Sequence, residues 1–583
     1  MNKNLIVSLV IGVAILAMMS ACTPQVVEKI VEKEVVKTVV VEQTKVVEAQ
    51  PVIVKNAWGK ELPAGALPVD KQVLTLPCQE GKYMDVAASF YDASKSCGGV
   101  MLWERLVMLD ENSNVVPGVA DKWEQSADGT SWTFHLRDGV KWSDGSPLVA
   151  KDFEFALKRQ LDPKTGSGFT WFYSDIKNAG DVSEGKVPTD QLGVKATDEK
   201  TLVIETVGTI PYLPQLMAFP SSGPIPQKMV EEFGDKWSID PKTCLTNGPW
   251  KLAEYSAGKQ IVLDPNPNYV GIHTPIIEKL IFKPGTGTAD FSAYQAGEID
   301  GMFADQDTTP ITPTDYKMII ADPRLRRELY AYPYFATRYF FINPTVKPWD
   351  DLKVRQAVAH AIDRQALLDV IYDGLGSPAY GMLPVGFPAY KPMDEVQKFD
   401  VKLAKQLLAE AGYPDGKGFP EITLWYKNDE EAKILTCTMV QSMLKENLGI
   451  NVKLQPVETK VFNATFAKGD IAFGLQNWEF DFIDPSNFLN VWNPELGRHK
   501  EWNNTKFNEL TKQAGSEKDP VKRLQMYEDA NKILSEDIGG IFLYNWGHAQ
   551  MWKPKVMGIS KDTLGFMRVP YYSLGFHSLY VGE

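Results

Sequence analysis

The sequence predicts a large α/β protein built from several domains. With 583 residues, the chain has the length of roughly two to four ordinary domains. Helical and strand patterns alternate through its second half, which is typical of an α/β domain. Hairpin patterns prevail in the first half and indicate mixed sheets. No repeat is long enough to indicate a solenoid.

Local patterns in the first half predict short strands and turns followed by a helix. Alternating apolar residues predict a strand at 132–136 and a second one at 140–142, with turns at 138–139 and 143–145. A helix is expected after Pro147, because an acidic residue and an apolar series follow it.

Further along, two strands are expected around the turn at 257–258. One long amphipathic helix is predicted across 351–372. A helix, turn and strand follow in that order at 401–426, and a helix and strand at 431–457. This second half therefore carries the α/β pattern.

Composition and charge exclude one class of partner. The formal net charge is −13 at pH 7, and no cluster of Lys and Arg stands out that could displace the counterions of a nucleic acid. Apolar residues make up 44% and charged residues 23%, which are values for a globular protein. The 15 Trp, 22 Tyr and 27 Phe supply aromatic side chains both for the core and for binding surfaces.

The N-terminal residues have the pattern of a secretory signal. Lys3 precedes an apolar run from Leu5 to Met19, which is short for a membrane span, and two small residues stand directly before Cys22. This segment resembles the lipobox of bacterial lipoproteins, although Met19 stands where Leu is commoner. The resemblance implies removal of residues 1–21 and attachment of lipid to Cys22.

Residues 22–69 are predicted to form a low-complexity stalk and a linker. A Val-Val-Glu/Lys unit recurs every four or five residues through 26–48 without Gly or Pro. β-branched residues weaken a helix, so a frayed coiled coil and an extended stalk both stay open. Folded sequence is expected from near Asp70.

Four cysteines follow the signal segment. In the oxidising compartment that export implies, Cys78, Cys97, Cys244 and Cys437 are candidates for disulfide pairing. The preferred pair is Cys78 with Cys97, because it closes a short loop before an apolar segment. The sequence does not fix the connectivity.

Enzyme motifs are missing or out of order. No HExxH, Gly-x-Ser-x-Gly or P-loop occurs, and the six histidines show no metal-ligand spacing. Lys-Thr-Gly at 164–166 precedes Ser183 and Lys186, whereas the penicillin-recognising serine enzymes have the reverse order. A glycosidase using Glu479 or Asp481 requires a partner carboxylate about 5 to 10 Å away, which a sequence cannot show. We therefore predict no enzyme, no catalytic residue, no metal and no cofactor.

Four segments together resemble one family. They lie in the family's order and at plausible spacing, and the resemblance extends from about residue 63 to near the C-terminus. The segments are "WTFHLRDGVKWSDGSPL" (132–148), "VEEFGDKWSIDPKTCLTNGPWKL" (230–252), "DLKVRQAVAHAIDR" (351–364) and "WEFDFIDPSNF" (478–488). This resembles the extracytoplasmic solute-binding proteins of the peptide/nickel-type ABC importers, solute-binding protein family 5, and most of all their oligopeptide receptors.

The resemblance implies an α/β two-lobed, periplasmic-binding-protein-like clamshell with an additional mixed α+β domain. Its hinge is expected near residues 336 and 549, where a few loop residues absorb a rotation. The expected divisions are 70–103, 220–335 and 550–583 for lobe I, 104–219 for the extra domain and 336–549 for lobe II.

The function that the resemblance implies is that of a receptor. A monomer held outside the cytoplasmic membrane by its lipid captures short peptides and delivers them to the membrane subunits of an ABC permease, without nucleic acid or cofactor. The alternative is an oligosaccharide receptor of the same family, because Trp rings can stack on sugars.

The segment around Trp478 carries the predicted site. Alternation sends Trp478, Phe480 and Phe482 to one face of a strand and Asp481 to the other, while Asp484 before Pro485 fits a helix N-cap.

In peptide-binding members of the family, a Trp-x-x-Asp motif carries the aspartate that pairs with the α-ammonium of the ligand. The resemblance assigns that role to Asp481. We predict Trp478 and Asn477 as further ligand-binding residues, and alignment with the family adds Tyr91, Ala93 and Phe169. The preceding stretch has one basic residue, Lys468, so the handling of a ligand carboxylate stays open.

Overall fold

A computed structural model describes most of the chain that follows the predicted stalk. The described residues are 54–78, 81–88, 98–110, 114–285, 288–302, 311–559 and 574–583. The signal segment with Cys22, the stalk up to residue 53, and Tyr91, Ala93 and Cys97 lie outside them. Among the helices within these ranges, none has both the length and the apolar character needed to cross a membrane.

One four-stranded sheet brings together distant parts of the sequence. Its order is β1-β10-β9-β8, with β1 parallel to β10 and the other pairs antiparallel. The strands are β1 (Val73–Cys78), β8 (Trp250–Ser256), β9 (Gln260–Pro265) and β10 (Lys279–Pro284). The hairpin of β8 and β9 confirms the two strands predicted around 257–258.

A second four-stranded sheet, antiparallel throughout, has the order β4-β5-β7-β6. Its strands are β4 (Ala120–Gln125), β5 (Ser131–Leu136), β6 (Val194–Ala196) and β7 (Thr201–Glu205). The helix α3 (Ala150–Leu161) packs against β6 and β7. Both β5 and α3 confirm predicted elements.

The strand predicted at 140–142 is wrong. Only an isolated bridge between Lys141 and Pro147 forms there, because the chain turns back at once, with Ser146 O accepting from Trp142 N at 2.9 Å. The Trp142 side chain is buried, and its Nε1 donates to Asp152 Oδ2 at 3.3 Å. The same carboxylate accepts from Val149 N at the start of α3, so this part of the resemblance motif fastens the turn to the helix.

The largest sheet has eight strands. Its main path is β11-β18-β13-β17-β15-β16, and β12 and β14 also pair with β18. The strands are β11 (Gly301–Met302), β12 (Leu329–Pro333), β13 (Ala336–Ile342), β14 (Gly376–Pro378), β15 (Ile422–Lys427), β16 (Val452–Val457), β17 (Phe473–Glu479) and β18 (Gly540–Trp552). β15 runs parallel to β16 and β17, whereas β13 is antiparallel to β17 and β18.

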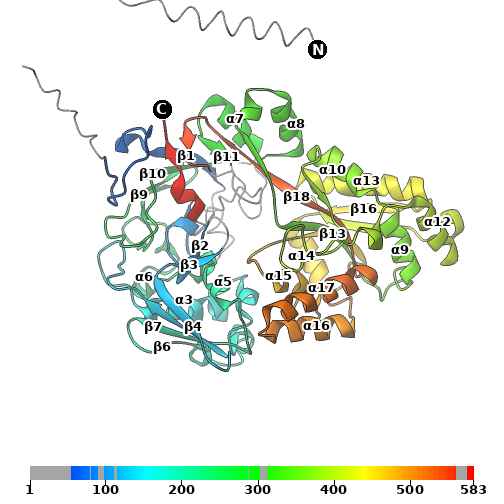
Figure 1. The fold of residues 1–583 in the computed structure, drawn as a ribbon, viewed down its shortest axis with the longest axis horizontal. Coiled ribbons are helices and arrows are strands. Elements are labelled where there is room, and N and C mark those ends of the chain that lie inside the picture. Colours follow the sequence, from blue (N-terminus) through cyan, green and yellow to red (C-terminus); the bar gives the residue numbers. More distant parts are fainter. Residues whose placement is uncertain are drawn as a thin grey trace, which may run out of the picture. The chain divides into compact units, whose positions relative to one another are not determined.

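Helices cover both faces of this sheet (Figure 1). Along β13, Phe340 and Ile342 pack in one apolar cluster, while Tyr339 and Phe341 pack in another, as the two-residue period of a strand requires. The first cluster includes α9 (Leu352–His360), α10 (Arg364–Tyr372), α12 (Val401–Glu410) and α13 (Glu431–Leu448). The second includes α14 (Thr459–Ala467), α15 (Pro485–Leu489), α16 (Thr505–Ser516) and α17 (Pro520–Glu536).

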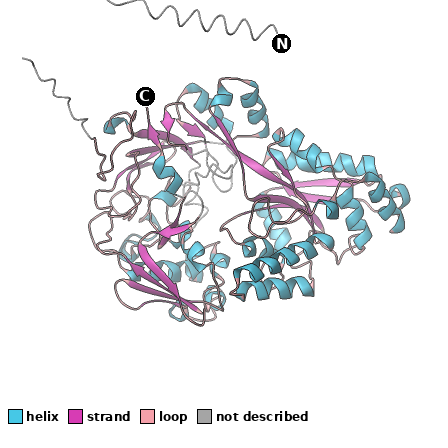
Figure 2. Ribbon diagram, viewed as in Figure 1, coloured by secondary structure: helices cyan, strands magenta, loops and turns pink. Residues whose placement is uncertain are grey.

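This arrangement, visible by element type in Figure 2, confirms an α/β layer structure and the elements predicted at 401–426 and 431–457. The single helix predicted across 351–372 is wrong. Asp363 caps a new helix there by accepting from Ala366 N, so α9 and α10 are separate.

The described chain has further short strands and α-helices. The strands are β2 (Val107–Leu109), β3 (Val115–Pro117), β19 (Val556–Met557) and β20 (Tyr580–Val581). The helices are α4 (Ala179–Ser183), α5 (Leu213–Met217), α6 (Gln227–Phe233), α7 (Thr288–Ala296), α8 (Pro313–Ala321) and α11 (Asp394–Gln397).

The cysteines behave in two ways. Cys78 is disulfide-bonded, and since its partner lies outside the described residues, the pairing with Cys97 stays a prediction. Cys244 and Cys437 are free and buried, so including them among the candidates for pairing was wrong. Burial raises the pKa of both thiols, as expected for small apolar core residues.

Candidate ligand-binding site

The predicted motif lies where a central strand of the eight-stranded sheet ends. β17 closes at Glu479, and Trp478 stands opposite Thr337 of the neighbouring β13. Asp481 follows two residues after the end of the strand and is partly exposed. The carboxylate is therefore carried by a turn that directly follows a rigid, buried strand.

The three aromatic residues of the motif do not share one face. Trp478 and Phe480 pack in the cluster around α14–α17, but Phe482 belongs to a different cluster and stacks on Tyr212, with 5.2 Å between ring centroids. The alternation of a strand stops where β17 ends at Glu479, so its period does not extend to Phe482. The prediction was wrong for that ring.

Asn487 fastens the two central residues of the motif to each other. Its Oδ1 accepts from Trp478 Nε1 at 3.2 Å and from the backbone N of Asp481 at 3.1 Å. Its Nδ2 donates to Asp481 Oδ2 at 2.9 Å. Asn487 is buried in the first turn of α15, so the carboxylate of Asp481 is held in one direction by the fold itself.

Asn477 lies beside this group on β17. It is partly exposed, and its Nδ2 donates to Glu479 Oε1 at 3.2 Å. The two residues are two positions apart on the strand and so share the face opposite to Trp478. A polar pair thus runs along the strand toward the turn that holds Asp481.

Phe169 lies behind an exposed ring that the sequence did not indicate. It is 2% exposed and stacks on Phe172 and Phe219. Its ring centroid is 5.0 Å from that of Trp171, which is 37% exposed. Trp171 in turn meets Trp478 edge to face at 6.0 Å, and so connects Phe169 to the motif.

Asp484 has the structural role that the sequence predicted. Its carboxylate accepts from Ser486 N and caps α15. The same carboxylate forms a buried bidentate ion pair with Arg523, in which Nη1 donates to Oδ2 at 2.6 Å and Nη2 donates to Oδ1 at 2.8 Å. Burial lowers and Asp484 raises the pKa of Arg523, and the net direction is upward. Asp484 is thus fully committed to the fold.

The remaining predicted site residues, Tyr91, Ala93 and the lipidation residue Cys22, lie outside the described part of the chain. Their roles stay predictions. Across the described ranges, no three His, Cys, Asp or Glu side chains come together as a group that could hold a metal ion.

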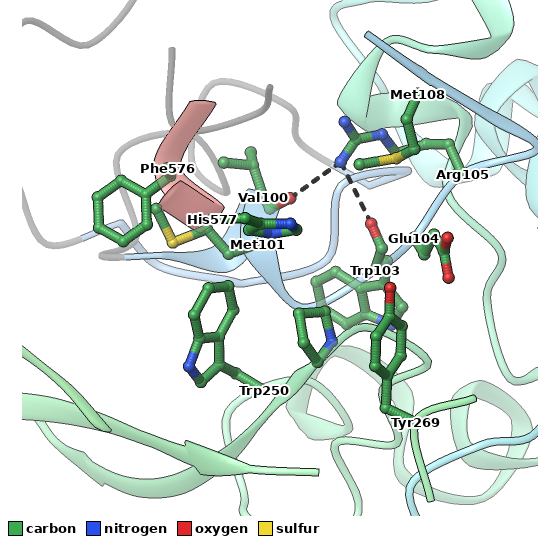
Figure 3. A pocket seen from close by; sticks show the side chains of 11 residues that line it. Val100, Met101, Trp103, Glu104, Arg105, Met108, Trp250, Tyr269, Phe576 and His577 are labelled. Atoms are coloured by element: carbon green, nitrogen blue, oxygen red, sulfur yellow. Dashed lines mark hydrogen bonds between the residues drawn. The ribbon is translucent and has the colours of Figure 1, made fainter. Parts of the chain in front are cut away.

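A small cavity with a largely apolar lining lies elsewhere, between the segment 100–108 and residues of the first sheet and the C-terminal segment (Figure 3). It is lined by side chains that include Glu104, Arg105, Tyr269 and His577, and its volume is ≈ 20 Å³, which suits about one water molecule and no peptide. Burial raises the pKa of Glu104, against the effect of Arg137, and lowers that of His577 to about 3. None of the predicted ligand residues lines it.

Comparison with known proteins identifies the family. The family model described as "Bacterial extracellular solute-binding proteins, family 5 Middle" matches residues 114–498. The chain belongs to this family. It is 32% identical over 473 residues to the periplasmic oligopeptide-binding protein OppA of Salmonella typhimurium, across 79% of this chain and 85% of the relative.

Solved structures of the family share the fold. The murein tripeptide binding protein MppA of Escherichia coli matches with a TM-score of 0.71 and 29% identity, across 88% of this chain and 98% of that one. Haemophilus influenzae OppA in complex with RPPGFSPFR matches with a TM-score of 0.70 and 27% identity, across 88% and 99%.

These likenesses confirm the predicted resemblance and the predicted fold, an α/β clamshell of two lobes with an additional domain. The family description also agrees with a transport protein outside the cytoplasm.

Sequence reasoning missed three residues at this site. Asn487 is six positions beyond Asp481, and its role depends on α15 folding back over the turn. Trp171 is far away in the sequence, and no motif marks Arg498, whose guanidinium lies over both Trp171 and Trp478. The aromatic run "FTWFY" at 169–173 could have indicated Trp171, but nothing indicated Arg498.

Proposed function

We propose that this protein is the lipid-anchored receptor of an ABC importer, which captures short peptides outside the cytoplasmic membrane and delivers them to the permease. In this proposal Cys22 carries the lipid, and rotation near residues 336 and 549 closes the lobes over the ligand. The protein acts as a monomer and performs no reaction of its own.

One observation carries the proposal. Asp481 presents a partly exposed carboxylate that Asn487 orients beside the Trp478 ring, in a chain whose relatives are named oligopeptide-binding proteins. A peptide amino terminus offers three N–H donors and a full positive charge. A pre-oriented carboxylate meets both requirements, and the cost of burying the ammonium is offset by the ion pair.

In this proposal, the other predicted residues line the ligand site around Asp481. Trp478 and Asn477 frame the carboxylate, and Phe169 backs the exposed Trp171 ring, while Tyr91 and Ala93 complete the proposed lining. The ligand backbone is held as an added strand, which gives affinity through main-chain hydrogen bonds and makes little demand on side chains.

Calorimetry with alanine tripeptides tests the anchor. Changing Asp481→Asn should weaken binding of a free-amine peptide by about 2 to 5 kcal/mol, because the ammonium then lacks its charge partner. N-acetylation of the peptide should cause a similar loss in the unmodified protein and little further loss in the variant. Asp470→Asn, at an exposed position on the same lobe, is the matched control. An unchanged affinity of Asp481→Asn for the free-amine peptide would contradict the proposed role of Asp481 as the partner of the ligand ammonium.

Native mass spectrometry of the protein as purified tests the ligand class. Co-purified peptide masses support the proposal. Oligosaccharide masses favour the alternative receptor, in which Asp481 accepts from hydroxyl groups. A Cys22→Ala variant that still partitions with membranes would contradict the lipid anchor.

A further inference from the structure

Arg498 stands out among the charged residues near the motif. It is exposed, and its guanidinium carbon lies 5.3 Å from the ring centroid of Trp171 and 4.9 Å from that of Trp478. These two rings come from segments about 300 residues apart in the sequence and contact each other at an angle of 64°. The guanidinium thus fits against two indole rings at once.

No carboxylate among the described residues pairs with this guanidinium. The ion pairs of the described chain engage many of its arginines, including Arg338, Arg355 and Arg523, but not Arg498. Within the described residues, its side chain contacts the two indole rings, and its backbone forms hydrogen bonds. The guanidinium carries five N–H donors and makes no hydrogen bond to another described residue, so these groups stay available for a two-point contact with a carboxylate.

The backbone that carries Arg498 is fixed. Its N donates to Val491 O at 2.9 Å. The preceding Gly497 lies so close to the chain that an added Cβ would come within 2.3 Å of Asn490 O, so no larger residue fits there. The following His499 is buried and bonded to Tyr339 at 2.9 Å. The side chain therefore projects from a rigid loop rather than from a freely moving one.

Trp478 connects Arg498 to the proposed anchor. The Nε1 of Trp478 donates to Asn487, and Asn487 in turn donates to Asp481. The guanidinium of Arg498 lies over the same indole ring. The carboxylate of Asp481 is thus connected to this guanidinium through the side chains of Asn487 and Trp478. An extended peptide advances about 3.3 Å per residue, so a ligand with its amine on Asp481 would meet Arg498 with one of its first few residues if its chain runs over Trp478.

We propose that Arg498 is a specificity-determining residue that binds a carboxylate on the solute, and that the preferred ligands are peptides with an acidic group within the first three residues. This inference rests on the proposed peptide function. It also supplies a cation for the ligand carboxylate in a chain where the stretch before Trp478 offers only Lys468. The carboxylate can come from an acidic side chain or from the C-terminus of a very short peptide.

Calorimetry with three peptides separates these sources. Ala-Glu-Ala-amide has a side-chain carboxylate, Ala-Gln-Ala-amide has none, and Ala-Gln-Ala with a free C-terminus has a terminal one. The unmodified protein should bind one or both acidic peptides about 10-fold to 100-fold more tightly than the neutral peptide, the range expected for a charge-assisted contact. The acidic peptide that gains affinity identifies the source.

Variants then assign the preference to Arg498. Arg498→Gln should bring the three affinities close together, and Arg498→Lys should keep part of the preference, because it retains the charge but loses the planar fork. Lys500→Gln, an exposed neighbour in the same loop, is the matched control for the loss of one positive charge and should keep the full preference. Thermal unfolding of each variant checks that the fold is unchanged.

Two results overturn the inference while leaving the peptide function standing: equal affinity of the unmodified protein for all three peptides, or an undiminished acidic preference in Arg498→Gln. If none of the three peptides binds the unmodified protein, the proposed function and this inference both fail.

Discussion

Two arginines of this protein lie over similar pairs of aromatic rings but differ in burial and in their carboxylate partner. Each lies over one aromatic ring from the segment 169–219 and one from the segment 478–527: Arg498 over Trp171 and Trp478, and Arg523 over Tyr212 and Tyr527. Arg523 is buried and has a two-fold carboxylate partner. Arg498 is exposed and has none among the described residues. Both arginines lie over aromatic rings. The presence of a carboxylate partner determines whether the guanidinium stabilises the fold or remains available to a ligand.

The region around Arg523 is a closed network. Asp484 receives both arms of the guanidinium, and Nε donates to Ala514 O at 3.0 Å. Tyr212, whose ring lies under the guanidinium, donates its hydroxyl to Asp175 at 2.8 Å. Nearly every polar group in this region has a partner within the protein, so few hydrogen-bonding groups remain for a ligand. Within the described ranges, the guanidinium of Arg498 has no such internal partner.

The largest effect is expected from Arg523→Met. Removing the cation leaves the buried carboxylate of Asp484 unpaired, which should lower the free energy of unfolding by about 3 to 5 kcal/mol. Urea denaturation at neutral pH measures this change. The double variant Arg523→Met with Asp484→Asn should recover much of the loss, since no charge then remains unpaired. A loss below about 1 kcal/mol in the single variant would show that the pair is not part of the structural framework.

An intermediate effect is expected from Asp175→Asn, and it depends on pH. Burial raises the pKa of Asp175, the Tyr212 hydrogen bond lowers it, and the charge of Asp484 raises it further, with a net upward direction. The folded state thus binds the proton more tightly than the unfolded state, so stability rises as the pH falls toward the ordinary value of 3.8.

In Asp175→Asn this contribution is absent. The unfolding free energy of the unmodified protein should therefore increase relative to that of the variant as the pH is lowered from 7 to 4, by up to about 1.4 kcal/mol per pH unit within the titration range. Urea titrations at pH 4, 5, 6 and 7 provide the comparison. Parallel pH profiles for the two proteins would contradict the raised pKa.

The smallest effect on stability is expected from Arg498→Gln. An exposed guanidinium on two rings contributes little to the fold, so the unfolding free energy should change by less than about 1 kcal/mol. Thermal and urea unfolding give this value. A loss as large as that of Arg523→Met would erase the difference between the two regions and assign Arg498 to the fold.

Much of the fold could be predicted from the sequence because its signals are local. The hairpin of β8 and β9 and the order of helix and strand from α12 to β16 follow from periodicity and turn residues. The break between α9 and α10 was missed, because an apolar helical pattern continues across a residue that acts as an N-cap.

The site was predictable only in part, for a related reason. Asp481 and Trp478 lie in a contiguous motif, and the cap at Asp484 follows from its proline neighbour. Trp171 and Arg498 meet only because two distant segments pack together. Phe482 was assigned to the wrong face, because no sequence signal marks the end of a strand one turn before a helix. Contacts set by tertiary packing carry no local pattern.

The position of β18 in the chain has a consequence for how the molecule is made. This strand, Gly540–Trp552, pairs with β11, β12, β13 and β14, all of which precede it in the chain and so leave the ribosome before it. The eight-stranded sheet can therefore form completely only after β18 has been synthesised. Folding that depends on such distant pairings is slow, so the edges of β12 and β14 that β18 covers stay unpaired until it arrives.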